Sequence, residues 1–177
     1  MAITKLDLTK AVSGTLPDGN APSGSIIQIK SATKTDTQSS SSQTFADVTD
    51  MSVSITPSST SSKILAFGYC NVSYDNNTAK SAIQLVRGTT NILIGDAAGS
   101  RTRVTGFAYV PQDNLAPVPL TFNFLDSPST TSATTYKIQF ARLDGAGTVY
   151  VNRSDLDQDT GIMGRSASTI TIMEIAG

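Results

Sequence analysis

The sequence has 177 residues, a net charge of −1, only 15% charged residues and no histidine. Its length fits one domain with a sizeable core, and it has no basic surplus for binding nucleic acid. The missing histidine excludes Ser-His-Asp and Cys-His catalysis and the usual zinc sites, so neither an enzyme nor a cofactor is expected.

The first 24 residues differ in composition from the rest. Scattered apolar residues are followed by closely spaced prolines and glycines, which prevent regular structure. We expect residues 1–24 to form an extended attachment arm, with a disordered tail as the alternative. The apolar anchors of this arm are Ile3, Leu6, Leu8 and Val12.

Neither the start of the chain nor any later run resembles a membrane-directed segment. The first ten residues lack the apolar stretch of a signal peptide. No apolar run approaches the ~20 residues of a membrane helix, so membrane insertion is not expected. We therefore expect a protein that is made in a cytoplasm.

From Ser25 onward, short β-type runs are separated by clusters of Ser, Thr, Gly and Pro. The expected strands lie at 25–31, 51–56, 63–74, 81–87, 91–94, 120–125, 136–140, 149–151 and 168–175. The Ser/Thr-rich segment 34–43 fits either an edge strand or a loop. No stretch has a helical period. About ten strands predict an all-β domain over residues 25–177, a two-sheet antiparallel jelly-roll sandwich, with an up-and-down barrel as the alternative.

Two of these runs are apolar on both faces. In 64–72 the two faces alternate residue by residue, and the last strand repeats the pattern. Because a sandwich strand normally shows one face to water, we expect a second copy of the chain to cover the other face. The alternative is a central strand covered by loops. The expected interface residues are Leu65, Phe67, Tyr69, Ile170, Ile172 and Met173.

Polar, turn-rich loops are the candidates for ligand contact. They contain amphipathic tyrosines and closely spaced aspartates. The candidate residues are Asn76, Asn77, Tyr109, Asp155, Asp157 and Asp159. The aspartates resemble half of an EF-hand loop, but Thr160 and Ser166 replace its Gly and Glu, so a metal site is not expected. Exposed, solvated loop residues are the alternative reading.

Two further features have ordinary readings. Arg101 and Arg103, near Asp96, either form ion pairs at a subunit contact or are exposed surface residues. Cys70 lies in an apolar run, and with no histidine to activate a thiol we expect a small buried hydrophobe.

Several phrases of the sequence resemble a domain common in virion structural proteins of tailed bacteriophages, notably marine and cyanobacterial ones. The phrases are residues 55–65, 84–87, 94–101, 124–128 with 134–137, and 170–177. The resemblance spans about residues 26–177. It implies a compact β-sandwich, a trimeric knob similar to C1q/TNF-like jelly rolls. The segments that carry the resemblance are structural motifs and contain no catalytic residues.

The resemblance leads to two hypotheses about function. In the first, a homotrimeric knob is pinned by its arms to the capsid or tail protein at the virion surface, as a capsid decoration (cement) protein or head fibre. The short segment before the domain favours such a stand-alone knob over a long fibre. In the second, the knob is a tail-fibre-type module whose loops recognise host surface glycans.

Overall fold

The computed structural model describes residues 21–75, 79–109 and 116–177, and this part of the chain contains strands and no helix. The strands are β1 (Ile26–Lys34), β2 (Gln38–Ser40), β3 (Ala46–Ile55), β4 (Lys63–Tyr74), β5 (Ser81–Arg87), β6 (Thr90–Ile92), β7 (Gly106–Ala108), β8 (Val118–Asp126), β9 (Thr134–Arg142), β10 (Val149–Val151) and β11 (Ser168–Ile175). The all-β prediction is confirmed.

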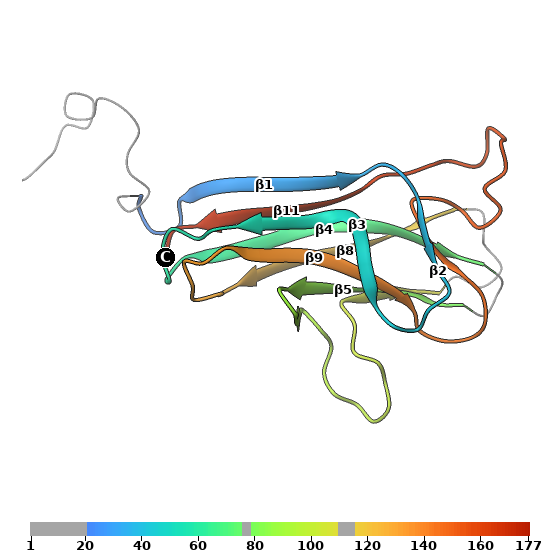
Figure 1. Ribbon diagram of the computed structural model, residues 1–177, viewed down its shortest axis with the longest axis horizontal. Coiled ribbons are helices and arrows are strands. Elements are labelled where there is room, and N and C mark those ends of the chain that lie inside the picture. Colours follow the sequence, from blue (N-terminus) through green and yellow to red (C-terminus); the bar gives the residue numbers. More distant parts are fainter. Residues whose placement is uncertain (1–20, 76–78, 110–115) are drawn as a thin grey trace, which may run out of the picture.

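The strands form two antiparallel sheets of jelly-roll type, so the barrel alternative is wrong (Figure 1). The first sheet has the order β1-β11-β4-β10-β2, with β8 on the other side of β4. The second has the order β3-β9-β5-β6, with β7 also paired to β5. The uncertain Ser/Thr-rich segment contributes a short edge strand, β2, paired with β10.

The core lies between the sheets and takes one face of each long strand. From β4 it contains Ile64, Ala66, Cys70 and Val72. Tyr136, Ile138 and Phe140 of β9 meet them from the second sheet, as their alternation predicts. The same alternation turns Leu65, Phe67 and Tyr69 to the outer side of the first sheet.

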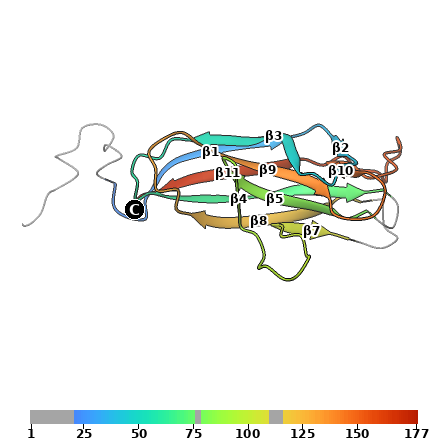
Figure 2. The ribbon, with the colours of Figure 1, turned by 60° about the horizontal axis from the view of Figure 1, so that its bottom comes forward.

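The strands run along the long axis of the molecule, so the turns gather at its two ends (Figure 1 and Figure 2). The end that we call the base holds the turns 56–62, 88–89 and 127–133. The chain enters there at Gly24, whose N–H donates to the Ala176 carbonyl at 2.8 Å. The opposite end, the tip, holds the loops 143–148 and 152–167.

The two ends differ in charge. The three base turns contain no charged residue and are mainly Ser and Thr, whereas the tip loops carry Asp144, Arg153, Asp155, Asp157, Asp159 and Arg165. Burying uncharged hydroxyls costs less desolvation energy than burying ions. The base turns therefore cost less to desolvate in a contact with another protein than the tip loops.

Candidate functional surfaces

The outer side of the first sheet is a continuous apolar surface. Antiparallel pairing places Ile29 beside Met173, Met173 beside Leu65, and Leu65 beside Leu125, so one row crosses four strands. Paired residues point to the same side of a sheet. Phe67, Tyr69, Ile26 and Ile175 extend the row along the strands. We call these eight side chains the apolar face.

The apolar face is accessible in the single chain. Ile26, Ile29, Leu125 and Tyr69 are 57%, 55%, 53% and 38% exposed. The remaining members are half-buried. Monomeric proteins seldom leave a large apolar patch open to water, and such patches mark contact sites.

Two of the six expected interface residues lie elsewhere. Ile170 and Ile172 are fully buried in the core between the sheets, so their assignment to an interface is wrong. The last strand is apolar on both sides, and Met173 and Ile175 occupy the outer one. The other four expected residues, Leu65, Phe67, Tyr69 and Met173, lie on the apolar face.

The outer side of the second sheet is polar. The hydroxyls of Ser54 and Thr135 are 2.7 Å apart, and Asp47 binds both Lys137 and Gln139, at 2.9 and 2.7 Å. Strand β5 is buried throughout Ser81–Val86. It pairs with β9, β6 and β7, and residues of the loop 93–105 contact it: Gln84 donates to the Arg103 carbonyl and the Thr105 hydroxyl accepts from Leu85 N–H. Among the described strands, β5 matches the alternative of a central strand covered by a loop.

The protruding loop 93–105 holds the two expected surface arginines (Figure 2). Both guanidinium groups bind backbone carbonyls of the loop, Arg101 that of Ala98 and Arg103 that of Gly95. Among the described residues, neither arginine forms an ion pair with Asp96. These arginines shape their own loop.

The tip brings together part of the expected ligand residues. Tyr109 is 42% exposed, with Lys80 Nζ 5.2 Å from its ring centroid and the Tyr74 ring 6.3 Å away. Lys80 also pairs with Asp144 at 2.9 Å. Tyr74, whose ring stacks on that of Tyr109, is buried. Asn76 and Asn77 lie outside the described residues.

Two of the three aspartates of the loop 152–167, Asp155 and Asp157, have structural partners. Asp157 accepts two hydrogen bonds from Arg165, both 2.6 Å, and lies 3.4 Å from Arg153. Burial and a hydrogen bond to Asp155 raise the pKa of Tyr150. Asp159 is exposed. With its charge compensated by two arginines, Asp157 is poorly suited to calcium, and the described residues contain no group of three that could hold a metal.

Two buried carboxylates at the base were missed by the sequence analysis. Glu174 accepts hydrogen bonds from the backbone N–H and hydroxyl of Ser58, the Ser62 hydroxyl and the Gln28 amide, at 2.6 to 2.7 Å. Burial opposes its ionisation, but these donors hold the pKa of Glu174 below its usual value. The turn 56–62 is therefore a cradle for this carboxylate.

The second buried carboxylate is Asp126. It accepts two hydrogen bonds from Arg87 Nη1, at 2.8 and 2.9 Å, and one of 2.5 Å from the Tyr136 hydroxyl. Burial and the neighbouring carboxylate raise the pKa of Tyr136, so the phenol stays protonated and donates. Arg87, Asp126 and Tyr136 each lie in one of the segments 84–87, 124–128 and 134–137 that carry the sequence resemblance. Only the fold shows that these three segments meet.

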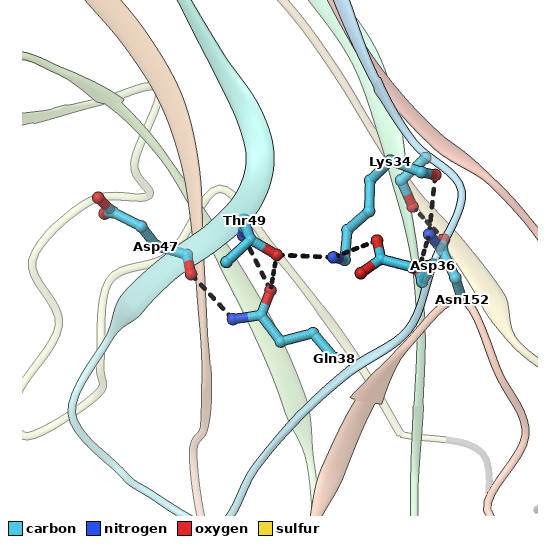
Figure 3. A network of polar contacts seen from close by, with 7 residues as sticks. Lys34, Asp36, Gln38, Asp47, Thr49 and Asn152 are labelled. Carbon is cyan, nitrogen blue, oxygen red and sulfur yellow. Dashed lines mark hydrogen bonds and ion pairs between the residues drawn. The ribbon is translucent and has the colours of Figure 1, made fainter.

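A third polar cluster joins the two sheets towards the tip (Figure 3). Lys34 is fully buried, and its Nζ lies 2.7 Å from both Asp36 Oδ1 and Thr49 Oγ1. Gln38 binds Thr49 and the Asp47 carbonyl, while Asn152 donates to the carbonyls of Lys34 and Asp36. This cluster links the first sheet with β3 of the second.

The lone cysteine is buried as expected. Cys70 is 0% exposed, and burial raises the pKa of its thiol to about 12. The anchors Ile3, Leu6, Leu8 and Val12 lie outside the described residues, so the attachment arm stays a prediction. No helix in the described ranges has the length and apolar character to cross a membrane.

Comparison with known proteins gives distant likenesses to solved structures and no match of family. No protein family and no curated protein matches the sequence. Among solved structures, the chain is similar to one described as the 2.6 Å structure of T=1 particles derived from infectious bursal virus. The two chains are 14% identical with a TM-score of 0.40. The match covers 93% of this chain and 41% of that one, so this chain spans less than half its length.

Proposed function

We propose that this protein is a non-enzymatic structural protein of a virus particle, which self-assembles through the apolar face. The observation that carries the proposal is the row Ile29–Met173–Leu65–Leu125, four apolar side chains in register across four strands. A second copy that covers this row removes apolar surface from water. Each Å² removed stabilises the assembly by ~25 cal/mol. The polar outer side of the second sheet then stays in contact with solvent.

The finer proposal follows the sequence resemblance. Three copies form a knob, as in C1q/TNF-like jelly rolls, and residues 1–24 attach it to capsid or tail protein of a tailed phage as a decoration protein or head fibre. Three arms attached together bind far more tightly than one. The support from the structure is the position of Gly24 at the base, which gives the three arms one common end from which to leave the knob.

The oligomeric state tests self-assembly directly. Native mass spectrometry of the free protein is expected to give three times the chain mass of 18.5 kDa. A monomer would contradict self-assembly, and a dimer would contradict the trimeric knob.

Deletion of residues 1–20 tests attachment. The truncated protein is expected to remain a folded trimer and to lose co-purification with virions. The control is the full chain carrying Gly161→Ala, a change in open space on a tip loop. Co-purification of the truncated protein at the level of this control would contradict the role of the arm.

A second function is favoured by the tip. Tyr109 presents an exposed ring beside the Lys80–Asp144 pair, at the end opposite to the base. We propose as the alternative that these groups contact host surface glycans, since an exposed tyrosine offers an apolar ring with a polar hydroxyl. Binding of purified protein to host cells is expected to fall with Tyr109→Ala and to persist with Ser54→Ala on the second sheet. Equal binding by both variants would reject this alternative.

A further inference from the structure

A polar pocket of about 400 Å³ opens near the base, on the side of the sandwich that holds the β5–β6 hairpin and the turn 127–133. Its lining consists of Arg87, Gly88, five threonines, Pro128 and Ala133. Arg87 is the only charged residue in this lining, and no carboxylate lines it. The pocket therefore offers the guanidinium group of one ion pair, surrounded by hydroxyls.

The guanidinium group at this pocket is held in place from behind. Both hydrogen bonds from Arg87 to Asp126 come from Nη1, and Asp126 is in turn fixed by the Tyr136 hydroxyl. The Arg87 side chain is 29% exposed and Asp126 only 8%. Because a guanidinium group carries five N–H donors in one plane, the edge that Asp126 does not use can receive a second carboxylate.

The composition of the lining also favours a carboxylate of a protein over that of an acidic sugar. None of the nine lining residues is aromatic, so the pocket lacks the ring on which a sugar would stack. The pairs Ile55–Thr134 and Ile64–Asp126 place it at the same end as Gly24 and Ala176. That end has uncharged turns and faces the particle if the arm attaches there.

We propose that this pocket binds a carboxylate of the particle protein, an acidic side chain or a chain terminus, and so fixes the orientation of the knob on its support. That the partner is a particle protein rests on the proposed function. That the ligand is a carboxylate rests on the geometry of the pocket alone. The Arg87 guanidinium would bind the carboxylate, and the threonine hydroxyls would donate further hydrogen bonds to it.

The probe for this site is acetyl-glycyl-glycine, with its C-terminal amide as the matched neutral control. We expect the free acid to shift the backbone amide NMR signals of Gly88, Thr89 and Thr130 in a saturable way. The amide probe is expected to leave them unchanged. Equal shifts from both probes, or none from either, would overturn the proposal. Shifts from glucuronate without shifts from acetyl-glycyl-glycine would also overturn it, in favour of an acidic sugar.

Variants separate binding from folding. Arg87→Met combined with Asp126→Asn removes both charges and keeps an acceptor for the Tyr136 hydroxyl, so no buried charge is left unpaired. We expect at least a tenfold weaker affinity for the free acid. Thr121→Val on β8, outside the pocket, is the control and is expected to bind normally. Unchanged binding by the double variant would overturn the proposal. The titration needs no virion, so its result is independent of the particle experiments.

Discussion

The Ser62 hydroxyl donates a hydrogen bond of 2.7 Å to Oε1 of Glu174, which lies 112 residues further along the chain. This bond and those from Ser58 fasten the turn 56–62 to the end of the last strand, beside the place where the chain enters the domain.

The Glu174 cradle makes stability depend on pH. The donors lower the pKa of Glu174 in the folded state, so its contribution is complete above the unfolded pKa and is lost as the pH falls through the folded pKa. Glu174→Gln places an amide NH₂ among donors and is expected to cost about 1–3 kcal/mol at pH 7. Urea unfolding at pH 7 and below about pH 4 checks this, because the difference between variant and parent should shrink in acid. A difference that stays the same at both pH values would contradict the role of the ionised carboxylate.

A single charged substitution on the apolar face is expected to give a soluble monomer. Leu125→Asp adds a charge at a half-exposed position and should break the assembly while leaving the fold intact. Light scattering after size-exclusion chromatography measures the mass, and circular dichroism reports the fold. Ser54→Asp on the polar outer side of the second sheet is the control and should leave the mass unchanged. A Leu125→Asp protein of parental mass would place the interface elsewhere.

Close packing of β4 against β11 makes Gly68 sensitive to any side chain. Its φ is 153°, and an added Cβ would lie 2.1 Å from the Thr169 carbonyl oxygen. Gly68→Ala is therefore expected to destabilise the fold by more than about 3 kcal/mol, because backbone must move. Gly88→Ala, at a positive φ but in open space, should cost only about 1 kcal/mol. Equal unfolding midpoints for the two variants would refute the steric argument.

The buried Lys34 can be replaced by an apolar side chain of similar length. Asp36 is largely exposed, so Lys34→Met leaves no buried charge behind and should change stability by less than about 1.5 kcal/mol. Lys34→Ala opens a cavity and is expected to cost about 2–4 kcal/mol. Chemical unfolding of both variants decides the matter. If the methionine variant were as unstable as the alanine variant, the ion pair itself would be essential.

The thiol of Cys70 should report global unfolding. Full burial and a pKa of about 12 leave almost no thiolate at neutral pH. We expect no reaction with a disulfide reagent in native buffer and complete reaction in denaturant. Rapid labelling of the native protein would show that the strand β4 opens locally.

Much of the architecture was readable from local pattern. Alternation at Met51, Val53 and Ile55, and at Tyr136, Ile138 and Phe140, assigned the buried side of β3 and β9, because side chains in a strand point alternately to its two faces. The same rule separated the two sides of β4. Missing histidine and sparse charge were compositional facts that bounded the chemistry before any fold was known.

Where both sides of a strand are apolar, the sequence by itself determined only that each side needs cover. The tertiary structure decided which is which: Ile170 and Ile172 face the second sheet, and Met173 faces outward beside Ile29 and Leu65. It also decided that Glu174 meets Ser58 and Ser62, and that Arg87 meets Asp126. The reason is that local periodicity is set by neighbouring residues, whereas these partners are set by strand order and register, which depend on contacts across the whole chain.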